Sequence, residues 1–157
     1  MGFHLVSLWS VHAPVEVVWD AIYHSERWTT WWNGLESVVE LERGKGEGIG
    51  NRRRYIWRGF LPYRLVVVMT ATRIEPSRRL EARAEGDVEG TGCWWFFAQD
   101  GRTCVRYDWR VRLVRPWMRR VSPLARSLFR WNHDVVMRRG AEGLAGHLRT
   151  RVTCQTA

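Results

Sequence analysis

The chain has 157 residues, a formal net charge of +9 and a sequence pI near 10.6. Of its 25 basic residues all but Lys45 are arginine, and 11 tryptophans accompany them. Hydrophobic residues make up 45% and charged residues 26%, which is ordinary globular usage and excludes a disordered or collagen-like chain. The length suits one domain with a core of its own.

The sequence has neither a membrane-span pattern nor a signal-peptide pattern. No run approaches the roughly 18–20 uninterrupted apolar residues that a spanning helix needs, and residues 1–7 lack a basic region followed by a long apolar one. Cys93, Cys104 and Cys154 are odd in number and have no C-x-x-C spacing, so we expect free thiols in the cytoplasm. Because the five histidines are scattered, we expect no metal site and no cofactor.

The first quarter of the chain predicts a strand followed by two short helices. Residues 3–12 form a strand-length run that ends before Pro14. Proline suits the first turn of a helix, and apolar residues then recur at helical spacing, which predicts a short amphipathic helix over residues 14–24. Residues 25–32 predict a further short helix or turn. After residue 34 the apolar pattern takes the period of two that is typical of strands.

The rest of the chain predicts a set of strands and then one long helix. Six strands are expected, at residues 36–42, 52–59, 63–74, 80–88, 93–99 and 103–114. The dipeptide Asp100-Gly101 predicts a two-residue hairpin turn, which pairs Phe97 with Cys104. The long helix begins at Ser122-Pro123 and reaches about His147.

This order of elements predicts an α+β fold of the helix-grip kind. A curved seven-stranded antiparallel sheet wraps around the long C-terminal helix, with two short helices after the first strand. We expect residues 1–150 to form this single domain and residues 151–157 to form a C-terminal tail. The hairpin register turns large aromatic side chains inward beside the small residues of strand 80–88. This contrast in size predicts an apolar internal cavity between sheet and helix.

Six segments carry a resemblance to a known family: 13–19 (APVEVVW), 28–32 (WTTWW), 73–76 (RIEP), 78–81 (RRLE), 106–109 (RYDW) and 130–134 (RWNHD). With the order of elements, they resemble the START-like helix-grip superfamily, also called the polyketide cyclase/dehydrase and lipid transport group. Segment 130–134 resembles a bacterial subgroup of it. The resemblance covers nearly the whole chain and implies this fold for it. It leaves the activity open, because the superfamily includes aromatase/cyclases, quinone-binding chaperones, lipid carriers and hydrolases.

The expected ligand contacts are mostly inward aromatic residues together with residues of the long helix: Trp57, Trp94, Phe96, Tyr107, Trp109, Asn132, Val136 and Arg139, with Trp28 and Trp32 at the cavity mouth. A helical wheel places an apolar sector on the long helix, made of Leu124, Leu128, Trp131 and Val135 at one side and of Ala125, Phe129 and Val136 at the other. Asn132 and Arg139 fall inside this sector. Either they project into the cavity and fix a polar group of the ligand, or Asn132 bonds a strand end and Arg139 reaches solvent.

No catalytic apparatus can be assembled from the sequence. His133 lies at the edge of the apolar sector without an orienting carboxylate, and we interpret it as a surface or structural histidine. No Ser-His-Asp or Cys-His arrangement is apparent. The catalytic residues, if the protein has any, are therefore not predicted.

The outer surface suggests further contacts. The hairpin register puts Trp95 and Phe97 on the outer face with Arg106 and Arg110, where cation–π stacking covers part of them. If they are exposed, they mark a contact surface such as a homodimer interface. Arginines on the strands alternate with acids, which indicates a solvated face and no specific nucleic-acid partner. The cluster at residues 115–120 suggests transient contact with an anionic membrane.

The sequence thus predicts a cytoplasmic protein that holds a hydrophobic small molecule, such as a lipid, a polyketide, an isoprenoid or another ring-bearing ligand. One alternative is an enzyme of the polyketide cyclase or aromatase type, which acts by positioning its substrate. A second alternative is an interaction module that uses the face of Trp95 and Phe97.

Overall fold

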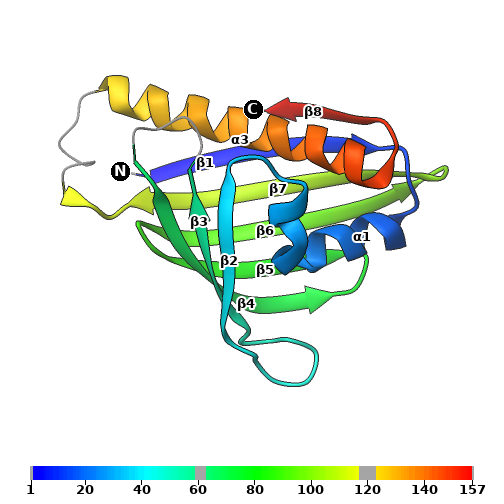
Figure 1. Ribbon diagram of the computed structural model, residues 1–157, viewed down its shortest axis with the longest axis horizontal. Coiled ribbons are helices and arrows are strands. Elements are labelled where there is room, and N and C mark those ends of the chain that lie inside the picture. The colour runs from blue at the N-terminus through cyan, green and yellow to red at the C-terminus, as the bar shows by residue number, and fades with distance from the viewer. Residues whose placement is uncertain (1, 59–62, 117–122, 157) are drawn as a thin grey trace.

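The computed structural model describes residues 2–58, 63–116 and 123–156 (Figure 1). Its elements follow in chain order: β1 (Gly2–Val11), α1 (Val15–Tyr23), the 3₁₀ helix η1 (Ser25–Thr30), β2 (Leu35–Glu42), β3 (Arg52–Trp57), β4 (Leu65–Glu75), β5 (Arg79–Gly86), β6 (Val88–Gln99), β7 (Arg102–Leu113), α3 (Pro123–Leu148) and β8 (Val152–Thr156). The predicted α+β class, the two short helices after the first strand and the long C-terminal helix are confirmed.

The strands form one antiparallel sheet in the order β2-β3-β4-β5-β6-β7-β1-β8. The prediction of seven strands is wrong by one. Residues 152–156, expected to belong to a tail, pair with β1 as the eighth strand and set Cys154 opposite Trp9. The reason is the free edge of β1, whose backbone groups need partners, together with Val152 and Cys154, which pack against the core.

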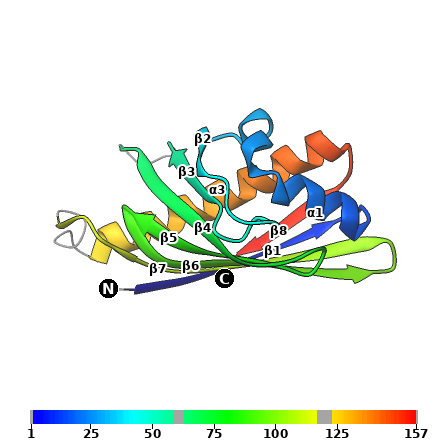
Figure 2. The same cartoon turned by 90° about the horizontal axis from the view of Figure 1, so that it is seen from below.

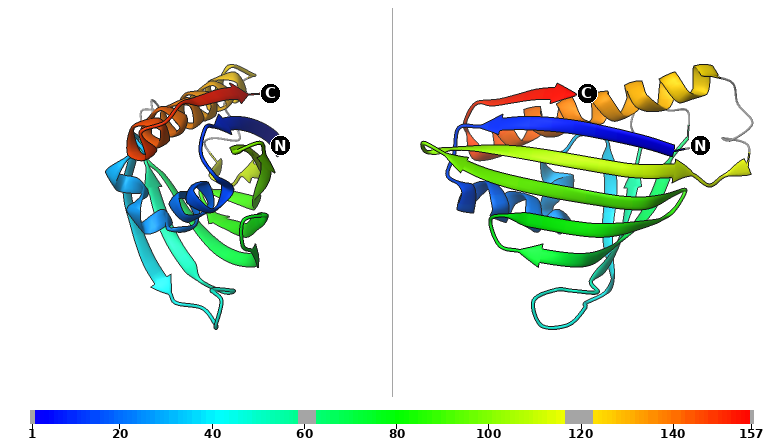
Figure 3. Two further views of the ribbon diagram at one scale, coloured as in Figure 1. Left: turned by 90° about the vertical axis from the view of Figure 1, so that its right-hand side faces the viewer. Right: turned by 180° about the vertical axis from the view of Figure 1, so that it is seen from behind.

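The sheet curves around its helices. Figures 1 and 2 show α3 and α1 on the same side of the sheet, and the end view in Figure 3 shows the strands curling from β1 round to β2 about them. This curling follows from the right-handed twist of strands. It gives the sheet a concave face, on which the core and the cavity described below are built.

The hairpin between β6 and β7 has the predicted register. Phe97 lies opposite Cys104, and the turn residues Asp100 and Gly101 have φ angles of 47° and 77°. Two successive left-handed residues are what a two-residue hairpin turn requires, because this turn matches the twist of its strands. The same register turns Trp94 inward and Trp95 outward.

The boundary between β5 and β6 differs from the prediction. The chain already reverses at Gly86, whose φ is +116°, and at Asp87, so that β6 begins at Val88. The Asp87 carboxylate accepts hydrogen bonds from the backbone N–H of Val66 (2.8 Å) and from Nε of Arg115 (2.6 Å). These bonds fix the turn several residues before the expected break.

Two glycines within β6 explain why this stretch resembles a loop in the sequence. A Cβ atom at Gly90 would collide with the carbonyl oxygen of Arg110, and one at Gly92 would meet the hydroxyl of Tyr107. Glycine in a strand commonly marks such a close approach. The residues are therefore required by packing against β7, not by a turn.

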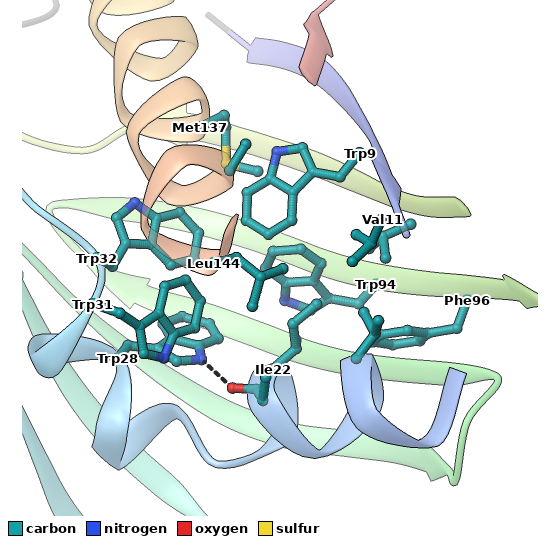
Figure 4. Close-up of a cluster of buried hydrophobic side chains, with 14 of the residues drawn as sticks. Trp9, Val11, Ile22, Trp28, Trp31, Trp32, Trp94, Phe96, Met137 and Leu144 are labelled. Atoms are coloured by element: carbon teal, nitrogen blue, oxygen red, sulfur yellow. Dashed lines mark hydrogen bonds between the residues drawn. The ribbon is translucent and has the colours of Figure 1, made fainter. Parts of the chain in front are cut away.

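Most of the core lies between α3, η1 and the concave face of the sheet. The side chains drawn in Figure 4 belong to the larger of two buried clusters, which includes Trp9, Val11, Ile22, Trp28, Trp31, Trp32, Trp94, Phe96, Met137 and Leu144. Two of these indoles are fixed by hydrogen bonds. Trp28 Nε1 donates to the carbonyl oxygen of Ala21 (3.2 Å, dashed in Figure 4), and Trp32 Nε1 donates to that of Val136 (2.9 Å).

The inward face of α3 is the predicted one only in part, at Phe129 and Asn132. Its buried residues are Phe129, Asn132, His133, Met137, Gly140, Ala141 and Leu144. Leu124, Leu128 and Trp131, which the helical wheel placed inward, are 77%, 42% and 51% exposed. The rotation of the helix is set by close approach: Cβ atoms at Gly140 and Gly143 would collide with the ring of Trp32 and the carbonyl of Trp31.

Within the described ranges, no helix is both long and apolar enough to cross a membrane. The three cysteines all lie in those ranges, are partly buried and form no disulfide with one another.

Candidate functional site

A cavity of about 400 Å³ lies between the concave face of the sheet and the α1–η1 segment. Strands β3 to β7 form its floor, Ile22 and Trp28 lie on the helical side, and the exposed residues Glu26, Arg43 and Gly46 border its open end. None of the residues of α3, all of which the structure describes, lies in its wall. The predicted position between sheet and C-terminal helix is therefore corrected: the core cluster fills that space, and the cavity lies beside it.

Aromatic side chains and very small residues share the floor. Trp94 and Tyr107, directly opposed on β6 and β7, stack with ring centroids 4.3 Å apart. Ala71, Ala82 and Gly92 lie next to them in the wall and have little or no side chain. The predicted contrast between large and small inward residues thus does leave an apolar space.

A polar cluster occupies one wall of the cavity. Arg53 on β3 donates from Nη1 to Ser25 Oγ (2.7 Å) and lies 3.1 Å from Oε2 of Glu26. Ser25 Oγ is also 2.7 Å from the hydroxyl of Tyr55. Ser25 is the first residue of η1, directly after α1, so the short helices bring it against β3. Arg53, Tyr55 and Trp57 alternate along β3, which points all three inward.

This cluster has hydrogen-bond donors left over. Ser25 and Tyr55 have two hydroxyl protons between them and use one in their mutual bond, so the other is available to the cavity. Nε of Arg53 is buried without a hydrogen-bond partner among the described residues. The Tyr107 hydroxyl likewise has no partner within that part of the chain. The cavity therefore offers donors to a ligand.

Burial and pairing set the protonation states. Burial raises the pKa of Tyr55, although the bond to Ser25 and the charge of Arg53 oppose it. Burial also raises the pKa of Tyr107, so both phenols are neutral at pH 7. Burial alone would raise the pKa of Glu26, but its own backbone N–H, Arg53 and His24 outweigh this and lower it. The two carboxylate oxygens of Glu26 are thus already engaged by Arg53 and by the ring of His24.

The mouth is bordered by the connection between β2 and β3. Gly46 and Gly48 line the cavity there, and the Tyr23 hydroxyl donates to the carbonyl of Glu47 (3.3 Å). Asn51 Nδ2 donates to Glu40 Oε1 and to the carbonyl of Arg43, both at 3.2 Å. These bonds tie the connection to α1 at one point and to β2 and β3 at its base.

Of the ten residues predicted for the site, half lie in the cavity wall: Trp28, Trp57, Trp94, Tyr107 and Trp109. Phe96 is buried away from the cavity, against Trp19 at 5.1 Å. Trp32 is buried against α3 rather than placed at the mouth. Asn132 is buried on the inward face of α3, and Val136 and Arg139 are half-buried, all outside the wall.

His133 is buried, not on the surface, and its ring stacks on that of Trp109 at 5.4 Å. It lies 3.7 Å from the carboxylate of its neighbour Asp134. Because Trp109 separates it from the cavity, His133 supports the wall from behind. Among the described residues, no three His, Cys, Asp or Glu side chains are grouped to hold a metal ion.

Sequence reasoning missed the polar cluster. Arg53, Ser25 and Tyr55 are not among the predicted ligand contacts. A signal was present, because placing Trp57 inward on a strand also turns Tyr55 and Arg53 inward by the period of two. No comparable signal in the sequence places Ser25 against β3.

The family description "Polyketide cyclase / dehydrase and lipid transport" matches residues 7–149. The chain belongs to this family. The match spans β1 to the end of α3 and so includes every residue of the cavity wall. The predicted START-like resemblance is confirmed at this level. No curated protein matches the sequence.

Several solved structures share the fold. The ZhuI aromatase/cyclase of Streptomyces sp. R1128 superposes with a TM-score of 0.74 at 17% identity, covering 95% of this chain and 94% of that one. A START superfamily protein of Mycobacterium smegmatis gives 0.74 at 14% identity, with 94% and 98% covered. The major latex-like protein 151 of Panax ginseng gives 0.68 at 7% identity, with 93% and 97% covered. At these identities the likeness establishes the fold alone.

Proposed function

We propose that this family member binds a ring-bearing hydrophobic molecule with acceptor oxygens in the cavity of β3 to β7. The observation that carries the proposal is the combination of a stacked aromatic floor with unused donors at Ser25–Tyr55, Arg53 and Tyr107. The rings of Trp94 and Tyr107 favour a flat ligand. The donors favour carbonyl, ether or carboxylate oxygens.

The size and lining of the cavity support the same class of ligand. Small-molecule sites typically measure about 300–1,000 Å³ and are mostly apolar with a few placed polar groups, and this one measures about 400 Å³. Burial contributes roughly 25 cal/mol per Å² of apolar ligand surface, less the cost of ordering the ligand. We include lipids, polyketides and isoprenoids in the class.

Native mass spectrometry of protein purified from its own host tests the proposal, with a retained apolar molecule as the expected result. Ala82→Phe adds a ring inside the wall and should reduce the retained fraction by tenfold or more. Ala98→Phe makes the same change at an exposed position of β6 and should retain ligand like the wild type. Equal retention in both variants, or no retained molecule in any preparation, would refute cavity binding.

An enzyme of the polyketide cyclase type is the second candidate. It is supported by the family and by the donor cluster, since donors aimed at a carbonyl oxygen also stabilise the enolate that forms in a cyclisation. Turnover of a poly-β-keto substrate with loss in Arg53→Met would favour it. A bound ligand recovered unchanged after incubation favours the carrier instead.

We infer that the arginine surface serves solubility and not specific nucleic-acid binding. Pairs such as Arg79–Glu81 (2.7 Å) and Arg83–Glu85 (3.0 Å) neutralise much of the outer face. Trp95 is covered by Arg79, 4.3 Å from its ring, in place of the expected Arg106 or Arg110. Phe97 is 52% exposed. We therefore keep a homodimer that forms through this face as a proposal. The unpaired cysteines support a cytoplasmic location.

A further inference from the structure

The outward face of the N-terminal half of α3 has an apolar stripe made of Leu124, Leu128 and Trp131, here called the α3 stripe. Its residues are 77%, 42% and 51% exposed. Spacings of four and three residues align them along one side of the helix, over about 10 Å. The other large apolar side chains exposed within the described ranges are spread one or two to an element. The stripe thus brings three exposed apolar side chains together on one short stretch of the surface.

The charge on the first half of this helix is one-sided. Helix α3 has four arginines and two acids, Asp134 and Glu142, and no acid precedes residue 134 on it. Arg126, Arg130 and Arg138 are exposed, and among the described residues no carboxylate lies within ion-pair distance of them. On the strands, by contrast, several arginines are paired with acids two positions away. Arg126, Arg130 and Arg138 thus lie around the stripe with no carboxylate of the described residues to neutralise them.

We propose that the α3 stripe docks on an anionic lipid surface, with Leu124, Leu128 and Trp131 inserted between headgroups and Arg130 and Arg138 near the phosphates. A helix with an apolar face containing leucine and tryptophan and with arginines on its polar sides has the chemistry of an interfacial helix. Each arginine near such a surface adds to the attraction within a Debye length.

A second copy of the chain fits the stripe less well. Three side chains expose on the order of a few hundred Å², whereas a stable dimer buries about 800 Å² on each partner. Two stripes placed face to face would also bring the unpaired arginines of both copies together. An anionic surface neutralises the same charges, so charge complementarity favours lipid.

Docking through this face is independent of the ligand proposed above. No residue of α3, which is described throughout, lines the cavity. The mouth is bordered by the β2–β3 connection and η1. Figure 1 shows the N-terminal half of α3, which carries the stripe, well away from that connection. The protein can therefore lie on a membrane with the mouth open.

The test is co-sedimentation of the full chain with vesicles of phosphatidylcholine, with and without phosphatidylglycerol, at low and high salt. We expect binding to the anionic vesicles only, reduced at least tenfold by high salt. The triple variant L124S/L128S/W131S should lose binding at least tenfold. The matched control L8S/L41S/F97S removes three exposed apolar side chains from other elements and should bind like the wild type. Circular dichroism checks that both variants are folded.

Three results would overturn the proposal. One is wild-type protein that stays in the supernatant with anionic vesicles at low salt. Another is a stripe variant that is folded and binds as well as the wild type. The third is a wild-type dimer that the stripe variant converts to a monomer, because a second copy would then cover the stripe. Ligand retention is measured separately by mass spectrometry, so neither proposal's failure is mistaken for the other's.

Discussion

The Tyr107 hydroxyl is a polar group in an apolar wall, positioned by ring stacking and without a hydrogen bond to any described residue. Its ring lies 4.3 Å from that of Trp94, and a Cβ atom at Gly92 would be 2.7 Å from the hydroxyl. The strands thus position this phenol without consuming its proton. This is the arrangement expected of a group that serves a ligand.

Tyr107→Phe should leave the free energy of unfolding within about 1 kcal/mol of the wild type at pH 7, because no hydrogen bond is lost. Burial raises the pKa of Tyr107 in the folded state, so its contribution to stability is complete below the unfolded pKa near 10 and is lost as the pH rises above it. The variant should lose stability more slowly in that range. Urea unfolding from pH 7 to 11 measures this, and parallel losses would contradict it.

Arg53→Met should weaken ligand retention tenfold or more, because a charge-assisted hydrogen bond contributes about 1.5–3 kcal/mol. Arg52→Met is the matched control. Arg52 is the preceding residue of β3 but points to the outer face, where it pairs with Glu42 at 2.9 Å. Native mass spectrometry of both variants gives the comparison. Loss of ligand in both would indicate that net charge, not the cavity contact, is responsible.

Arg53 also shows what the sequence could and could not predict at the level of one residue. Its inward orientation follows from strand alternation once Trp57 is placed inward. Its partners do not follow, because Ser25 comes from a segment 28 positions earlier that the chain folds back against β3. Long-range contacts of this kind depend on packing that no local pattern encodes.

At the scale of elements, the predictions for the hairpin and for the long helix had opposite outcomes. The register of β6 and β7 was predicted correctly because a two-residue turn fixes every pair along both strands. The face of α3 was predicted wrongly in part, because Leu124, Leu128 and Trp131 were taken as inward. Asn132 is buried as expected, but the inward face also includes His133 and the small residues Gly140 and Ala141. The close packing of Trp31 and Trp32, which follow η1, against α3 determined the rotation of the helix more than the hydrophobicity of its residues did.

Gly143→Ala should therefore destabilise the protein although alanine is the better helix former. The new methyl would collide with the carbonyl of Trp31, and overpacking costs typically 1–3 kcal/mol. Gly146→Ala, one turn on with open space around it, should instead stabilise by about 0.5–1 kcal/mol. Thermal unfolding of the two variants distinguishes them by the sign of the Tm shift. An increase in both would mean that α3 does not depend on this approach.

At the scale of the whole molecule, the sequence predicted an apolar cavity but placed it in the wrong part of the fold. Small inward residues of β5 beside Trp94 and Tyr107 correctly indicated unfilled space. The sequence gives no measure of how far α3 enters the curved sheet, and the indoles of Trp9, Trp31 and Trp32 fill the region beneath it. The space that stays open is displaced toward α1 and η1.

The C-terminal boundary of the domain is the remaining difference between the prediction and the structure. A truncation after Arg151 tests where this boundary lies. This truncation keeps the bonds from the backbone N–H of His12 to the carbonyl of Arg151 (3.0 Å) and from Thr150 Oγ1 to that of His12 (2.6 Å). It removes β8 and so uncovers the edge of β1 and the core beside Val152 and Cys154.

If residues 152–157 are only a tail, the truncated chain should unfold at the wild-type temperature. We expect instead a loss of about 3 kcal/mol or more from ladder bonds and apolar burial together. At roughly 2–4 °C per kcal/mol for a chain of this size, this lowers the Tm by about 6–12 °C. The double variant Thr153→Ser/Gln155→Ser keeps the backbone pairing and changes only exposed side chains, so its Tm should stay within about 2 °C of the wild type.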